Sequence, residues 1–311
     1  MQQDIKAQLL TKRPIELLFQ LSIPAVIGML VIGFYPFIDG IFAGNIIGQN
    51  AMTACGVAMP LTLFNNGVAT LLGVGSASVL SRAVGMGDQA KVDKIMGNLI
   101  YWVVILSTII TIGGILFAPH FLTLVGATGE IKALGIRYLR VVFIGSLFVN
   151  FTQSANMVMR GEGLMKKAML IMGLGAVLNI ILDPILMITM GDYAIEGAAL
   201  ASVIAQVLQA IVTLYYFKKK SKVVKIHRIQ SDGIIRREMF AIGISALMMQ
   251  SLFMIQQTIL YKMAFKYGGD ANGILMAASL RFYGFSFIPL WGMCQGLQPI
   301  IGTNFGAKQF D

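Results

Sequence analysis

The sequence predicts an all-α membrane protein whose helices cross the bilayer several times. Of its 311 residues, 57% are hydrophobic and 12% are charged, and the mean hydropathy is +0.77. Soluble domains carry about a quarter charged residues. Apolar runs of about 20 residues or more recur along the whole chain, and each is long enough to cross a bilayer. These observations predict a polytopic helix bundle.

Eight membrane spans can be placed between the loops in which charged residues concentrate. Several exceed the length needed to cross the bilayer, so we expect them to tilt or to extend beyond the hydrocarbon. The spans cover residues 15–43, 52–84, 94–118, 133–159, 168–190, 195–217, 238–265 and 273–305.

Basic residues predict the orientation of the spans. Eighteen of the 24 Lys and Arg residues fall on one side of this arrangement and five on the other. Because cytoplasmic loops are enriched in Lys and Arg, both termini are predicted to be cytoplasmic. The net charge of +10 then favours contact with the anionic leaflet of the bilayer over binding of nucleic acid.

A weak internal repeat suggests that the chain holds two related lobes. At an offset of 219 residues, Gly73 matches Gly292 and Gly87 matches Gly306. Internal repeats are typical of secondary transporters. If the second lobe also needs six helices, four of an expected twelve are missing and the second lobe is truncated; a genuine eight-span protein is the alternative. The predicted divisions are a first lobe over 1–217, a basic cytoplasmic linker over 218–237 and the start of a second lobe over 238–311.

Most ionisable residues lie in loops, and the clear exceptions are Asp39, Asp183 and Arg281. A charge at bilayer depth costs several kcal/mol, so such residues usually face a cavity or a partner and mark function. The two aspartates are predicted to lie within roughly 5 Å of each other in depth. A buried ion pair that only fixes packing is the alternative reading, and for Arg281 we favour that or a pocket-shaping role.

Other polar residues are predicted to gather near these aspartates. Asn179 precedes Asp183 by four residues and therefore shares its helix face. Ser202 and Tyr138 fall at a similar depth in their own spans. Two carboxyl groups, an amide and two hydroxyls can hold a proton or coordinate a hard cation through oxygen.

Prolines interrupt the spans that carry the aspartates. Pro24 and Pro36 lie in the first span, and Pro184 follows Asp183 directly. Each removes a backbone donor and frees the carbonyl four residues earlier, which must find another partner in a membrane. These prolines are predicted to bend their helices when a neighbouring acid changes its charge, although a static kink is also consistent with them.

Several segments together resemble the multidrug and toxic compound extrusion (MATE) family, in its bacterial DinF/MepA-like branch. The resemblance extends over the whole chain, and its specificity lies in the order of the segments. They are FYPFIDGIFAG (34–44), MRGEGLMKKAM (159–169), LNIILDPILM (178–187), EGAALASVIAQ (196–206) and the more variable RFYGFSFIPLWGMCQG (281–296).

This resemblance implies two six-helix lobes around a central cavity, alternating access, and export of cationic or amphipathic compounds in exchange for H⁺ or Na⁺. It implies a monomer in the bacterial plasma membrane, with no other cofactor and no catalytic residue. The implied coupling site, which includes a candidate Na⁺ site, uses Asp39, Asn179 and Asp183, with Tyr138 and Ser202; some relatives have Thr in place of Ser202. The substrate cavity would include Asn156, Gln153 and Arg281.

Two other functions are consistent with parts of the sequence. Residues 85–88 spell GMGD, a pattern of intramembrane aspartyl proteases, but the chain has no Tyr-Asp partner motif and Asp88 falls in a loop. A lipid-linked saccharide flippase of the same wider superfamily would need a cationic cavity. Arg137, Arg140 and Arg281 keep that alternative open, whereas the paired acids favour cationic substrates.

Overall fold

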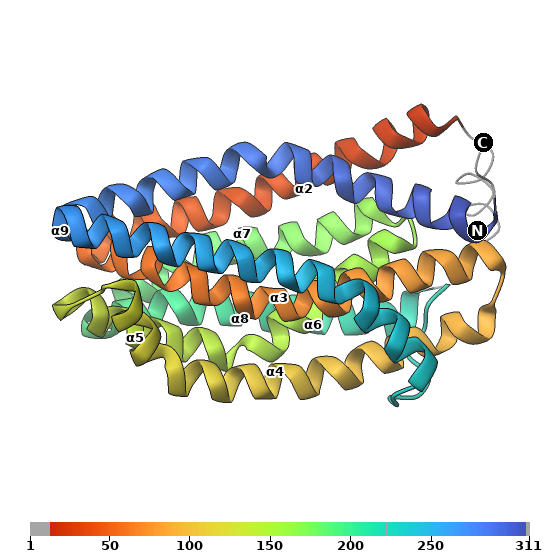
Figure 1. The fold of residues 1–311 in the computed structure, drawn as a ribbon, viewed down its shortest axis with the longest axis horizontal. Helices are drawn as coiled ribbons and strands as arrows, with labels where there is room; N and C mark the ends of the chain where they lie inside the picture. The colour runs from red at the N-terminus through yellow and green to blue at the C-terminus, as the bar shows by residue number, and fades with distance from the viewer. Residues whose placement is uncertain (1–12, 222, 309–311) are drawn as a thin grey trace.

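A computed structural model describes residues 13–221 and 223–308, and these residues form long helices joined by short turns (Figure 1). The helices from α2 to α8 correspond to the first six predicted spans. The elements are α2 (Pro14–Phe42), the π-helix η1 (Ala43–Ile47), α3 (Gln49–Met86), α4 (Gln89–Val125), α5 (Gly129–Ile144), α6 (Ser146–Gly161), α7 (Met165–Met190), the 3-10 helix η2 (Gly191–Tyr193), α8 (Ala194–Tyr215), the π-helix η3 (Tyr216–Lys220) and α9 (Gly233–Gly306).

The helices lie along one another in one elongated bundle (Figure 1). The beginning of α2 and the end of α9 lie at the same end of this bundle, at the right of the view. The turn from α3 to α4 and the segment between η3 and α9 are also found there. These segments carry most of the basic residues, so we call this end of the bundle the basic end.

The turns at the helix ends use the residues that such turns require. Gly87 ends α3 with φ 78° and Gly126 ends α4 with φ 99°, a left-handed conformation that costs glycine little. The Asp88 side chain then accepts a hydrogen bond from the backbone N–H of Lys91 and caps α4. Asp88 is therefore an exposed helix cap, which explains the GMGD pattern without a catalytic role.

The fourth predicted span is bent, where a single continuous helix was expected. α5 and α6 meet at Gly145 with an angle of 58° between them. The Thr111 hydroxyl of α4 donates to the Phe143 carbonyl near the end of α5 at 2.9 Å, and this carbonyl also accepts from the Gly145 N–H. A side chain from α4 thus holds the end of α5 at the bend.

The last two predicted spans lie in one long helical segment with a single break. Within α9, Gly269 has φ 59° and ψ −157°, a conformation that side-chain-bearing residues rarely adopt. Among the described residues, four segments are long and apolar enough to cross a membrane, or five if the bent α5–α6 pair counts as one span. Two of these segments are 56 and 74 residues long, more than twice the roughly 20 residues that one crossing needs.

The segment after η3 packs onto the bundle at the basic end. Val223, Val224 and Phe217 are buried in the same apolar cluster as residues of α3, α4 and α6. Glu162, in the loop between α6 and α7, is only 4% exposed. Burial raises the pKa of Glu162 to about 8, and the charge of Lys167 and the backbone N–H of Val224 lower it only in part.

Replacing Glu162 with glutamine is expected to remove a pH dependence of stability. The folded protein holds the Glu162 proton more tightly than the unfolded chain, whose pKa is near the ordinary 4.5. The stabilisation that the protonated Glu162 gives the folded state is therefore fully present below about pH 4.5 and is lost as pH rises through about 8. The thermal midpoint of the wild type in detergent should fall across this range, and that of E162Q should fall less. Parallel curves for the two proteins would show that Glu162 does not titrate in this way.

Candidate cation-binding site

Four polar side chains predicted to meet do lie inside the bundle, and three of them are joined by hydrogen bonds. The Asn179 amide donates to Asp183 Oδ1 at 3.1 Å and to Ser202 Oγ at 3.0 Å. The carboxyl groups of Asp39 and Asp183 are also in contact through a hydrogen bond and through their charges. Asp39 is 7% exposed, Asn179 2%, Asp183 0% and Ser202 8%. The set combines two carboxyl groups, an amide and a hydroxyl.

Close helix packing brings these residues together from α2, α7 and α8. A Cβ at Gly28 would lie 2.2 Å from the Met169 sulfur, so α2 approaches α7 closely. A Cβ at Gly197 would lie 2.8 Å from the Leu186 carbonyl oxygen, so α7 and α8 are equally close. The spacing of four residues places Asn179 and Asp183 on one face of α7. Small residues thus set the distances between the helices on which the site depends.

Oxygen atoms of Asp183 and Asn179 in this cluster are buried without a hydrogen-bond donor among the described residues. Within the described part of the chain, Asp183 Oδ2 and Asn179 Oδ1 accept no hydrogen bond. A buried acceptor without a donor costs about 1–3 kcal/mol. A proton on the carboxyl pair or a small cation between these oxygens would remove that cost.

The site has the donor types that suit a hard monovalent cation. Among residues 13–221 and 223–308, no group of three or more His, Cys, Asp and Glu side chains gathers as a metal site. Carboxyl, amide and hydroxyl oxygens nevertheless coordinate hard cations without any nitrogen or sulfur ligand. The residues present therefore fit Na⁺ or H⁺, which would be transported ions, and give no reason to expect a transition metal.

The structure places the other predicted site residues in different surroundings. Tyr138 is half-buried in α5 and packs against an apolar cluster that includes Leu122 and Ile195. The buried Asn156 amide donates to the Ala168 carbonyl at 2.7 Å, so this group fastens α6 to α7. Gln153 is half-buried in α6. These placements leave the coupling role of Tyr138 and the cavity roles of Asn156 and Gln153 as predictions.

Arg281 and the three prolines can be located only in part. Arg281 belongs to α9, but its side chain lies outside the described residues. Pro24 and Pro36 lie inside α2 and Pro184 lies inside α7. Each helix continues through its proline, so bending at these positions stays a prediction.

Sequence analysis missed a second polar cluster in the core of the bundle. The Asn150 amide donates to Asn65 Oδ1 at 3.1 Å and to Ser107 Oγ at 3.0 Å. All three residues are buried, on α6, α3 and α4. The signal was present, since uncharged amides inside apolar spans are as unusual as acids and need partners there. The cluster links three helices through neutral groups.

Comparison with known proteins agrees with this architecture. The MatE family pattern matches residues 24–185. The chain is 30% identical over 290 residues to the multidrug export protein MepA of Staphylococcus aureus (strain NCTC 8325 / PS 47). That match covers 93% of this chain and 64% of the relative, so the chain spans about two thirds of the length of this curated relative.

Solved transporter structures have the same fold. The chain matches a MOP superfamily transporter from Pyrococcus furiosus, described as having a binding pocket of reverse polarity that suggests a different function, with TM-score 0.88 and 30% identity. This match covers 97% of this chain and 67% of that one. It also matches the MATE multidrug transporter DinF-BH, solved in complex with a small molecule, with TM-score 0.89 and 31% identity over 97% of this chain and 69% of that one. The chain belongs to the MatE family and has the all-helical fold of MATE transporters.

Proposed function

We propose that this chain is the greater part of a secondary active transporter that exports cationic or amphipathic compounds in exchange for H⁺ or Na⁺. One observation carries the proposal: Asp39 and Asp183 are buried in contact, beside an amide and a hydroxyl, and Asp183 Oδ2 and Asn179 Oδ1 accept no hydrogen bond from the described residues. Two buried carboxyl groups in contact favour the uptake of a positive ion. A positive ion bound to this pair would then compete with a cationic substrate bound elsewhere in the protein. Such competition between the two cations is what exchange requires.

The similar proteins support this assignment. The relatives include a multidrug export protein and a multidrug transporter solved with a bound small molecule. The family consists of transporters and not of enzymes. We infer that the protein is a monomer with eight crossings in this chain, divided as a first lobe (1–217), a linker (218–237) and the start of an incomplete second lobe (238–311). The basic end then faces the cytoplasm of a bacterial cell.

A flippase for an anionic lipid-linked saccharide is supported less well. Such a protein needs arginines free to hold a pyrophosphate. Arg137 instead forms a bidentate ion pair with Glu196, and its guanidinium also donates to the backbone oxygen of Asp192. One of the cations that kept this alternative open is therefore already neutralised.

The proposal is tested by efflux from vesicles containing the full-length protein, with the Na⁺ and proton gradients imposed separately. A cationic dye such as ethidium should be transported against its gradient under at least one of the two. Dye accumulation that is the same with and without each gradient would contradict cation coupling. Transport of a lipid-linked pyrophosphate, with none of the dye, would favour the flippase.

A further inference from the structure

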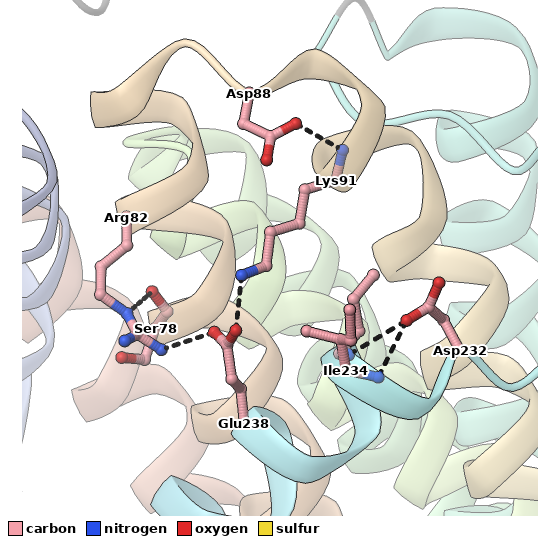
Figure 2. A network of polar contacts seen from close by, with 8 residues as sticks. Ser78, Arg82, Asp88, Lys91, Asp232, Ile234 and Glu238 are labelled. Carbon is pink, nitrogen blue, oxygen red and sulfur yellow. Dashed lines mark hydrogen bonds and ion pairs between the residues drawn. The ribbon is translucent and has the colours of Figure 1, made fainter.

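A network of charged side chains joins α9 to two helices of the first lobe at the basic end (Figure 2). Glu238, near the beginning of α9, accepts from Lys91 Nζ at 2.7 Å and from Arg82 Nη2 at 3.3 Å. Arg82 lies near the end of α3 and Lys91 in the first turn of α4, and both side chains point toward Glu238 in Figure 2. One carboxylate thus connects the two helices that meet at the α3–α4 turn.

A second set of contacts holds the start of α9 beside α4. The Asp232 side chain accepts from the backbone N–H groups of Ile234 and Ile235 and from Lys94 Nζ. The N–H of Ile235, and then Lys94, hold the pKa of Asp232 below its ordinary value, so it stays charged. The Trp102 indole donates to the Ser231 hydroxyl at 3.2 Å. The cap made by the Asp232 side chain fixes where α9 begins, so that Glu238 in the second turn faces Arg82 and Lys91.

Glycines close the space between α3 and α9 directly behind this network. A Cβ at Gly75 would lie 2.1 Å from the Met239 carbonyl oxygen, and one at Gly85 would lie 2.5 Å from that of Thr303. The Ser76 hydroxyl is 1% exposed and lies 3.1 Å from the Met239 sulfur. With these backbones in contact, no water path passes between α3 and α9 near these residues.

The contact between α3 and α9 toward the opposite end is of a different kind. There Gly56 packs against Ala277 and the Tyr261 hydroxyl. In the described ranges, the ion pairs from α3 and α4 to Glu238 of α9 and to Asp232, which caps α9, all lie at the basic end. When two charged surfaces separate, water solvates the groups that become exposed. When two apolar surfaces separate, the exposure of apolar area costs about 25 cal/mol per Å² in free energy. At the basic end the charged groups can be solvated when the surfaces part, and the cost of parting comes from the buried Ile235 and Met239 side chains.

We propose that Glu238, Arg82 and Lys91 form the gate that closes the basic end of the transporter between its two lobes. The inference rests on the alternating-access function proposed above. The side chains of Arg82, Lys91 and Glu238 are 29%, 18% and 32% exposed, so water reaches them and the pairs can break and re-form.

The gate is tested by the accessibility of a reporter cysteine at position 76. In the full-length protein, Cys55 and Cys294 are replaced with alanine and Ser76 with cysteine. A membrane-impermeant maleimide is added on the cytoplasmic side. Loss of two half-exposed ion pairs in E238Q is expected to raise the labelling rate about five- to tenfold. The double variant K91E/E238K, which restores one opposite-charge pair, should recover part of the protection.

K94Q is the matched control, because it removes a neighbouring ion pair on the same face without touching Glu238. Its labelling rate should equal that of the parent. Unchanged labelling in a folded E238Q, an equal increase in K94Q, or no recovery in the charge swap would each overturn the gate. Labelling requires no transport, so a gate that responds as expected without dye efflux would reject only the proposed function. Normal efflux with unchanged labelling would reject only the gate.

Discussion

Replacing Asp183 or Asp39 with asparagine is expected to abolish gradient-driven efflux while the protein still folds. The two carboxyl groups are in contact inside the bundle, and Asp183 also accepts a hydrogen bond from Asn179. An amide of nearly the same shape keeps the packing but cannot exchange a charge. With one carboxyl group left, the cluster loses the repulsion that uptake of a cation relieves.

The size of the effect follows from the driving force that the cation supplies. One elementary charge moving across 100 mV provides about 2.3 kcal/mol, which corresponds to roughly a fiftyfold concentration ratio. In the wild type this force can hold a monovalent cationic dye up to about fiftyfold per 100 mV away from its own equilibrium distribution, and each single variant should lose that displacement. Dye accumulation in vesicles at a clamped potential measures this ratio.

Asp192→Asn is the matched control, since Asp192 is an exposed carboxylate in the turn that joins α7 to α8. It should transport as the wild type does. Should D39N and D183N both export the dye at normal rates under either gradient, the two acids would be structural and the coupling account would be wrong.

Replacing Gly243 with valine is expected to cause a large loss of stability. A Cβ at this position would lie 2.0 Å from the Leu71 carbonyl oxygen, while real Cβ contacts stay above 3.0 Å. Because the obstacle is backbone, α3 and α9 must move apart by about 1 Å, and overpacking of this kind costs about 1–3 kcal/mol. The thermal midpoint in detergent should fall by about 5 °C.

Gly284→Val provides the control within the same helix. No atom lies within 4 Å of a Cβ built at Gly284, so its thermal midpoint should stay close to that of the wild type. Equal losses in the two variants would mean that helix propensity, and not contact between α3 and α9, sets the cost.

Much of the bundle and part of the site could be predicted from sequence because they depend on local patterns. Apolar runs predict α2, α3, α4, α7 and α8 to within a few residues at most of their ends. The helical spacing of Asn179 and Asp183 predicts that they share a face, and depth along the spans predicts their neighbours Asp39 and Ser202. The hydrogen bonds from Asn179 to Asp183 and Ser202 confirm that these three residues meet.

Other features depend on contacts between distant segments and have no local signature. The bend at Gly145 is accompanied by a hydrogen bond from Thr111 of another helix. Asn156 carries the same amide whether it faces a cavity or, as here, the Ala168 carbonyl. Glu238 is an ordinary charged residue near a helix start until the fold brings Arg82 and Lys91 to it.

The central claim is that the Asp39–Asp183 cluster exchanges a small cation for a cationic substrate, and ion release during substrate binding tests it most directly. Dye binding to the purified full-length protein would be followed by calorimetry in buffers of different ionisation enthalpy and at several Na⁺ concentrations. We expect either release of about one proton per dye or competition between Na⁺ and the dye, with both effects lost in D183N. If dye binding to the wild type releases no proton and its affinity does not change with Na⁺ concentration, the account is contradicted.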